Sequence, residues 1–204
     1  MKLDRVLVGV LRPLVHLIFP HKCYGKENYP KPGEGVILCC NHISYLDPVF
    51  LMASQKRTIR FMAKAEFFES RFMRWAIGKQ FGGFPVERGK GDTKALDTAV
   101  ELVEKGEILG IFPEGTRSKT GELGRIKSGT ALIAARARAD IIPAVVVTRG
   151  QKVRAFRRSK VIFGKKITLD ELHLTDPDHP DLRYASRLIG QRFAEMIGEA
   201  KERK

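Results

Sequence analysis

The chain has 204 residues, of which 43% are hydrophobic and 29% are charged, so its length and composition suit one globular domain with a packed core. These values argue against a disordered chain, a collagen-like repeat and a protein with many membrane spans. Its 37 Lys and Arg residues outnumber 23 Asp and Glu residues, which gives a net charge of +14. This excess predicts an anionic partner: nucleic acid, an acidic membrane, an acidic carrier protein or a phosphorylated substrate.

The first twenty residues have the pattern of an amphipathic helix. Apolar side chains recur every three or four residues along positions 3–18. The apolar stretch is too short for a membrane span of about 20 residues, and Pro13 should bend or split the helix. Such a helix either lies in a membrane interface or packs on its own domain. We expect residues 1–28 to be a membrane-association segment and residues 29–204 to form the main domain. The basic residues on another face of the helix are Arg5, Arg12 and His16.

After a Pro- and Gly-rich connector, apolar runs typical of buried strands alternate with helical patterns. Helices are predicted after Asp92, which is a typical N-cap residue, over Thr130–Ala139, and from Asp181 to about Lys201. Strands that read as continuous apolar runs and alternate with helices predict an α/β fold with a mostly parallel central sheet flanked by helices. The predicted strands are Val36–Cys40, Thr58–Ala63, Gly83–Val86, Ile108–Phe112, Ile141–Val147 and Val161–Phe163.

In such folds ligands bind beyond the carboxyl ends of the strands, and a polar cluster follows the first predicted strand there. In this cluster Asp47 follows His42 by five positions. The carboxylate could accept one imidazole N–H across a turn, fix the tautomer and leave the other nitrogen basic, as in a general base that activates a hydroxyl. The spacing alone is weak, because His173 and Asp178 repeat it. That second pair lies in a polar stretch with no buried strand before it, and we predict a solvated loop there.

A second cluster follows the strand predicted at 108–112 and carries groups suited to a phosphate. Gly115 permits a close backbone approach or a positive φ angle. Glu114 would be a stabilised carboxylate that holds the loop or contacts a substrate hydroxyl. The alternative is an ordinary turn with a surface arginine. The possible phosphate donors of this cluster are Thr116, Arg117 and Ser118.

A third cluster directly follows the strand predicted at 83–86. It places Arg88 and Lys90 between glycines, which suits an anion. It lacks the complete P-loop pattern, because Asp92 follows Gly91 where that motif needs lysine. Nucleotide hydrolysis is therefore not expected.

Four blocks of sequence occur in a fixed order along residues 41–145, about half of the chain. They are Asn41-His42-x4-Asp47, Glu87-Arg88, Phe112-Pro-Glu-Gly-Thr-Arg-Ser118 and Ile142-Pro143-Ala144-Val145. In these blocks the chain resembles the glycerolipid acyltransferase family, and most of all its bacterial members that act on 1-acylglycerol 3-phosphate. The second block departs from the usual pattern by carrying Glu87 where the family has Asp. The resemblance implies an O-acyltransferase with that family's fold, which acylates the sn-2 hydroxyl of lysophosphatidic acid and gives phosphatidic acid for phospholipid synthesis.

The resemblance also implies roles for single residues. His42 would be the general base that deprotonates the sn-2 hydroxyl, and Asp47 would orient and polarise it. The alkoxide would attack the thioester of either acyl-CoA or an acyl-carrier protein, without an acyl-enzyme, a metal or a bound organic cofactor. Pro143 would shape the acyl-chain side of the site. The residues that would bind the substrate phosphate are Arg88, Glu114, Gly115 and Arg117, with Lys64 and Lys127 as further basic candidates.

The most basic stretch of the chain, Arg149 to Lys160, is either a solvated loop or a surface for anionic lipid or an acidic carrier protein. We expect an anionic phospholipid membrane surface as a partner, with the protein peripheral or monotopic at the cytoplasmic face. No recognised nucleic-acid motif accompanies the stretch, so nucleic acid is not an expected partner and a non-enzymatic nucleic-acid-binding protein is an outsider. The nearer alternative is an acyltransferase of the same family that acts on another lysolipid or on glycerol 3-phosphate. Three cysteines without zinc-like spacing predict reduced thiols in an intracellular protein.

Overall fold

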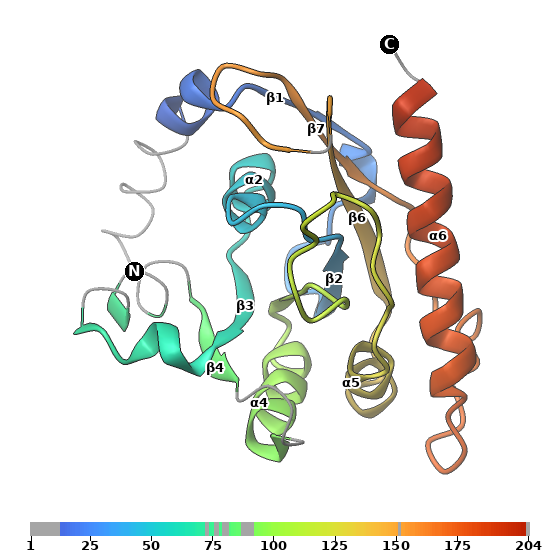
Figure 1. Ribbon diagram of the computed structural model, residues 1–204. Coiled ribbons are helices and arrows are strands. Elements are labelled where there is room, and N and C mark those ends of the chain that lie inside the picture. Colours follow the sequence, from blue (N-terminus) through green and yellow to red (C-terminus); the bar gives the residue numbers. More distant parts are fainter. Residues whose placement is uncertain are drawn as a thin grey trace.

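The computed structural model describes residues 13–71, 74–75, 78, 82–86, 92–150 and 152–202. Within these ranges the centre of the fold is a seven-stranded sheet in the order β1-β7-β6-β2-β5-β3-β4 (Figure 1). Strands β6, β2, β5, β3 and β4 run parallel to one another, whereas β7 is antiparallel to β6 and pairs in parallel with β1 at the edge. The strands are β1 (His21–Tyr24), β2 (Val36–Cys40), β3 (Ile59–Lys64), β4 (Phe84–Val86), β5 (Ile108–Ile111), β6 (Ile141–Thr148) and β7 (Ser159–Phe163).

Helices cover both faces of the sheet, which explains why its strands are apolar at every position. Along β2, Ile37 and Cys39 point into the core under α4, α5 and α6. The alternate residues of β2 pack on the other face with Phe50 and Leu51 of α2. The α-helices are α2 (Asp47–Ser54), α4 (Thr93–Glu104), α5 (Gly129–Ala137) and α6 (Leu182–Glu202), and the 3-10 helices are η1 (Lys26–Asn28) and η2 (Ala65–Phe68).

The predicted α/β fold with a mostly parallel sheet is confirmed, and each predicted strand is present with ends shifted by a few residues at most. The predicted helix start at Asp92 is also confirmed, because its side chain accepts the N–H of Ala95 at 3.0 Å. Gly106 follows α4 with a φ of +78°, and a Cβ there would lie 2.4 Å from the carbonyl oxygen of Gly33. Only glycine fits this close approach.

One α-helix and one strand were not predicted. Helix α2 begins at Asp47, where the sequence suggested only a turn. Pro48 lies in its first turn, where a backbone N–H has no partner within the helix and the missing N–H of proline is therefore not a loss. Strand β1 has two polar residues among four and therefore no apolar run to reveal it.

The predicted boundary between residues 28 and 29 falls inside the fold, because β1 pairs with β7 along residues 21–24. Residues 13–18 are helical and precede this strand, while the earlier part of the predicted amphipathic helix lies outside the described residues. None of the helices that the structure describes combines the length and the apolar character needed to cross a bilayer.

Candidate functional site

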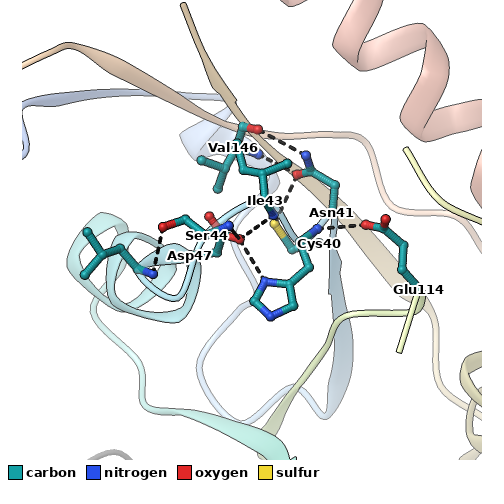
Figure 2. Close-up of polar contacts among 9 residues, drawn as sticks. Cys40, Asn41, Ile43, Ser44, Asp47, Glu114 and Val146 are labelled. Atoms are coloured by element: carbon teal, nitrogen blue, oxygen red, sulfur yellow. Dashed lines mark hydrogen bonds and ion pairs between the residues drawn. The ribbon is translucent and has the colours of Figure 1, made fainter. Parts of the chain in front are cut away.

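The carboxyl ends of β2 and β5 bring two of the predicted clusters together. The two strands are parallel neighbours, with Cys39 paired to Ile111, so the loops that follow them leave the sheet side by side. The backbone N–H of His42 donates to Glu114 Oε1 at 2.8 Å (Figure 2). The backbone N–H of Ser118 donates to the carbonyl oxygen of His42 at 2.8 Å. The loop after β5 therefore holds both backbone polar groups of His42.

Asp47 is fully buried beneath the imidazole of His42 and gathers three hydrogen bonds on one oxygen. Its Oδ2 lies 2.9 Å from His42 Nδ1 and accepts the backbone N–H groups of Ile43 at 2.8 Å and Ser44 at 2.7 Å (Figure 2). The carboxylate also stands in the first turn of α2, where the helix dipole favours negative charge. Because an ionised carboxylate only accepts hydrogen bonds, the contact places a proton on Nδ1 and leaves the lone pair on Nε2.

The plane of the His42 ring is set by aromatic stacking. Its centroid lies 4.1 Å from that of Phe112 with an angle of 22° between the rings, and Phe61 stacks behind Phe112 at 5.7 Å. The side chain of His42 is 13% exposed. The imidazole is therefore oriented on one side by Asp47 and on another by the stacked rings of Phe112 and Phe61, and it stays partly exposed to solvent.

Asn41, the residue before His42, joins β2 to β6. Its Oδ1 accepts the N–H of Val146 at 2.7 Å, and its Nδ2 donates to the carbonyl oxygen of Val146 at 3.1 Å (Figure 2). The side chain is almost fully buried, so both bonds are shielded from water. No role for Asn41 was predicted from the sequence, although an asparagine directly after an apolar strand is a signal for a side chain that bonds to a neighbouring strand.

Glu114 holds two loops together. Its Oε1 accepts the N–H of His42, and its Oε2 accepts the N–H of Gly124 at 2.8 Å. The side chain is 6% exposed, and a Cβ on Gly124 would lie only 2.8 Å from Oε2. Both oxygens thus face backbone amides, and a carboxylate in this position would repel a phosphate. These bonds match one of the roles predicted for Glu114, which is to hold the loop, and its contact with the substrate stays a prediction.

Two cations that were predicted to bind phosphate extend from the loop after β5. The guanidinium of Arg117 lies over the ring of Tyr45, 4.0 Å from its centroid, which is a cation–π contact on the same loop as His42. Lys127 passes over Gly115, whose φ is +73° and where a Cβ would lie 2.6 Å from Lys127 Nζ. A pocket of about 370 Å³ lies beside this loop, lined by Glu114, Thr116, Ser118, Thr120, Glu122, Leu123, Gly124, Arg125 and Lys127.

The remaining predicted site residues are placed differently. Lys64 ends β3 and forms an ion pair with Glu66 on the surface. Arg88 lies outside the described residues. Pro143 was predicted to shape the acyl-chain side of the site, but it lies within β6 with its ring toward Gly164 and Met196 of α6. This is the opposite face of the sheet from the one against which His42 stacks, so the ring of Pro143 does not lie beside His42.

The buried thiols of Cys39 and Cys40 are poor nucleophiles in this fold. Burial raises the pKa of the Cys39 thiol to about 12 and the pKa of the Cys40 thiol well above its ordinary value, so both stay protonated at neutral pH. All three cysteines are free, and Cys23 is half-buried beside Tyr29. The hydroxyl of Ser44 accepts the N–H of Leu46 at 3.1 Å and so belongs to the turn that leads into α2.

The second His–Asp pair forms the predicted solvated loop. His173 and Asp178 are exposed, and the ring of His173 stacks on Tyr184 at 4.1 Å. The loop follows Ile167, which pairs with Ile141 at the start of β6, so it lies at the end of the sheet opposite to His42. Tertiary placement thus separates two pairs that have identical spacing.

Comparisons with known proteins match most of the chain. The profile of the family described as Acyltransferase matches residues 21–147. The chain is 31% identical over 180 residues to 1-acyl-sn-glycerol-3-phosphate acyltransferase of Bacillus subtilis, a match that covers 86% of this chain and 87% of that protein. It is 33% identical over 129 residues to the chloroplastic 1-acyl-sn-glycerol-3-phosphate acyltransferase BAT2 of Brassica napus, which covers 62% of this chain and 37% of that longer protein.

A solved structure shows the same fold. The crystal structure of the 1-acyl-sn-glycerophosphate acyltransferase PlsC from Thermotoga maritima matches with a TM-score of 0.74 at 19% sequence identity. The match covers 99% of this chain and 80% of that one.

Proposed function

Because this chain belongs to the acyltransferase family, we propose that His42 is the general base with which it acylates the sn-2 hydroxyl of lysophosphatidic acid and forms phosphatidic acid. The observation that carries this proposal is the contact of 2.9 Å between His42 Nδ1 and the buried carboxylate of Asp47. That contact turns a basic Nε2 toward the open edge of the imidazole, where a hydroxyl can approach.

The reaction needs one proton carrier and one activated acyl group. Nε2 takes the proton of the sn-2 hydroxyl as its oxygen attacks the thioester carbonyl, and Asp47 stabilises the imidazolium that forms. A C–O bond then replaces the C–S bond, and the thiolate leaves as a thiol after it receives the proton from Nε2. The donor is acyl-CoA or an acyl-carrier protein, which carry the same thioester. The chemistry requires no metal ion and no bound organic cofactor.

An assay that crosses acceptors with donors tests this proposal. The purified full chain is incubated with lysophosphatidic acid, other lysophospholipids or glycerol 3-phosphate, each with acyl-CoA and with acyl-carrier protein, and the products are identified by mass. Phosphatidic acid should be the main product. A preference for glycerol 3-phosphate or for another lysolipid would replace the proposed acceptor and leave the proposed base in place.

We assign Arg117 to the phosphate of lysophosphatidic acid, because its cation–π contact with Tyr45 holds a guanidinium on the loop that binds the backbone of His42. Lys64, Lys127 and Arg88 are further candidates for the same phosphate. Arg117→Ala should raise the KM for lysophosphatidic acid by roughly ten- to a hundredfold, because one charge-assisted contact contributes about 1.5–3 kcal/mol. Initial rates at varied acceptor and donor concentrations measure the effect. The KM for the donor should stay near its wild-type value.

A surface arginine distant from the site provides the control for this prediction. Arg136→Ala removes the same type of side chain from α5, where the guanidinium pairs with Asp97 at 2.7 Å. This variant should keep the wild-type KM for lysophosphatidic acid. An equal rise in the KM for both substrates in Arg117→Ala would point to general damage rather than to a phosphate contact.

We further propose peripheral association with an anionic membrane at its cytoplasmic face, through the N-terminal segment. In the helical residues 13–18, Leu14 is 49% exposed and Leu17 is 70% exposed, whereas Phe19 packs on the core and anchors the segment. Leu14→Ser with Leu17→Ser should lower the binding of the full chain to phosphatidylglycerol vesicles by roughly tenfold, since two buried leucines contribute more than 1 kcal/mol to partitioning. Vesicle co-sedimentation measures this change. Unchanged binding would leave the helix as a packed surface element of the domain.

A further inference from the structure

The loop between β6 and β7 is tied to the N-terminal segment. It leaves the carboxyl end of β6, which is the edge of the sheet that also carries His42, and runs beside the N-terminal helix (Figure 1). The N–H of Phe156 donates to the carbonyl oxygen of Ile18 at 2.6 Å, and the N–H of Ser159 donates to that of Pro20 at 2.9 Å. Val153 and Phe19 pack on the same core cluster. The loop and the helix therefore form one surface.

This loop exposes a large apolar side chain, that of Phe156, to solvent. Phe156 is 75% exposed, more than any other large apolar residue among those that the structure describes. Its φ is +59°, a conformation that glycine adopts freely and a phenylalanine adopts at a cost. Neither the exposure of the Phe156 ring nor its positive φ angle stabilises the fold. The backbone N–H of Phe156 is bonded to Ile18, the last residue of the helix at residues 13–18, and this helix also carries the exposed Leu14 and Leu17.

The same loop is strongly basic. Residues 149–158 contain five cations and no acidic residue. All five side chains are exposed, and none of them forms an ion pair with a described residue. These cations, which we call the hairpin cations, are Arg149, Lys152, Arg154, Arg157 and Arg158.

We propose that this hairpin is a second membrane-contacting surface, in which Phe156 enters the interface of an anionic bilayer while the hairpin cations lie at the lipid phosphates. The inference rests on the membrane association proposed above and extends it from the helix to the catalytic domain. An aromatic side chain surrounded by cations, next to an exposed leucine stripe, matches a surface that is apolar within and anionic at its headgroups. An acidic carrier protein would match the cations but would not explain the continuity of Phe156 with the leucines.

Two variants of the full chain test the hairpin by co-sedimentation with phosphatidylcholine vesicles that contain phosphatidylglycerol. Phe156→Gly should lower the vesicle partition coefficient by roughly five- to tenfold while the midpoint of thermal unfolding stays equal or rises, because glycine suits a φ of +59°. Arg154→Glu with Arg157→Glu should lower it by at least roughly tenfold, since each basic residue contributes about a fivefold factor at an anionic surface.

Each variant has a matched control at the opposite end of the sheet. His173→Gly removes another exposed ring at a positive φ, +54°, and should bind vesicles like the wild type. Arg183→Glu with Arg187→Glu makes the same change of net charge on the exposed face of α6 and should have little effect. Activity on a short-chain lysophosphatidic acid below its micelle concentration should be unchanged in both hairpin variants.

The outcomes separate the two levels of the proposal. A wild-type protein that does not bind anionic vesicles would be evidence against membrane association altogether. Wild-type protein that binds them, with hairpin variants that bind equally well, would overturn only the role of the hairpin. Hairpin variants that bind vesicles normally but lose activity only with acyl-carrier protein as the donor would make the hairpin a protein-docking surface. This result would also overturn the inference.

Discussion

Replacing His42 with alanine is expected to lower the kcat of acyl transfer by roughly 10³–10⁴-fold, which is an upper range for the loss of a general base. The other described histidines are placed differently: His16 and His21 contact each other, His21 also lies against Phe50, and His173 and His179 are exposed in the loop before α6. The variant should still bind the donor, since the proton transfer and not the binding is lost. Single-turnover assays with each thioester donor measure the chemical step directly.

Two controls distinguish a lost base from a lost fold. The His42 side chain is 13% exposed and stacks on Phe112, so its truncation should cost only modest stability, which circular dichroism and the unfolding midpoint can check. His173→Ala removes an exposed ring that also stacks on an aromatic residue and should retain full activity. Activity near the wild-type level in His42→Ala would refute the proposed mechanism.

Asp47→Asn is expected to lower kcat by roughly 10³-fold or more with little change in the KM of either substrate. Asparagine can keep an oxygen at the position of Oδ2, where it would still accept the backbone N–H groups of Ile43 and Ser44. It removes the negative charge that stabilises the imidazolium and weakens the tautomer that leaves Nε2 basic. Steady-state kinetics and the unfolding midpoint are the measurements.

The environment of Asp47 makes this a test of charge. The other carboxylate oxygen, Oδ1, is buried and accepts no hydrogen bond from the residues that the structure describes. In Asp47→Asn the new amide group would occupy this position without an acceptor, which costs about 1–3 kcal/mol of stability. The double variant of His42→Ala and Asp47→Asn should be no less active than His42→Ala alone, because the two residues act as a unit. Additive losses would mean that Asp47 acts on the substrate separately.

The local features of this protein could be predicted from its sequence. Buried parallel strands are apolar at every position, so β2, β5 and β6 were visible as short apolar runs. The start of α4 at Asp92 and its end at Gly106 depend on residues within one turn. The contact between His42 and Asp47 is local as well, because a single turn folds one side chain onto the other.

Several features of the site depend on residues far apart in the chain. Asn41 is bonded to Val146 across 105 positions, and His42 to Glu114 across 72 positions, so neither contact leaves a periodic signal. The same reason applies to Pro143. Its block of sequence is recognisable, but only the packing of β6 decides which face of the sheet its ring occupies.

The net charge of +14 follows from the sequence alone, whereas the positions of the charged residues depend on the tertiary structure. The sequence alone determined the fold class, the His–Asp pair and an anionic partner, because composition, apolar runs and short motifs carry them. Only the tertiary structure decided that Glu114 holds the loop of His42 against the loop at Gly124. It also decided that the basic loop around Phe156 lies against the N-terminal helix. Long-range strand pairing sets these positions, and it is a property of the whole sheet rather than of any segment.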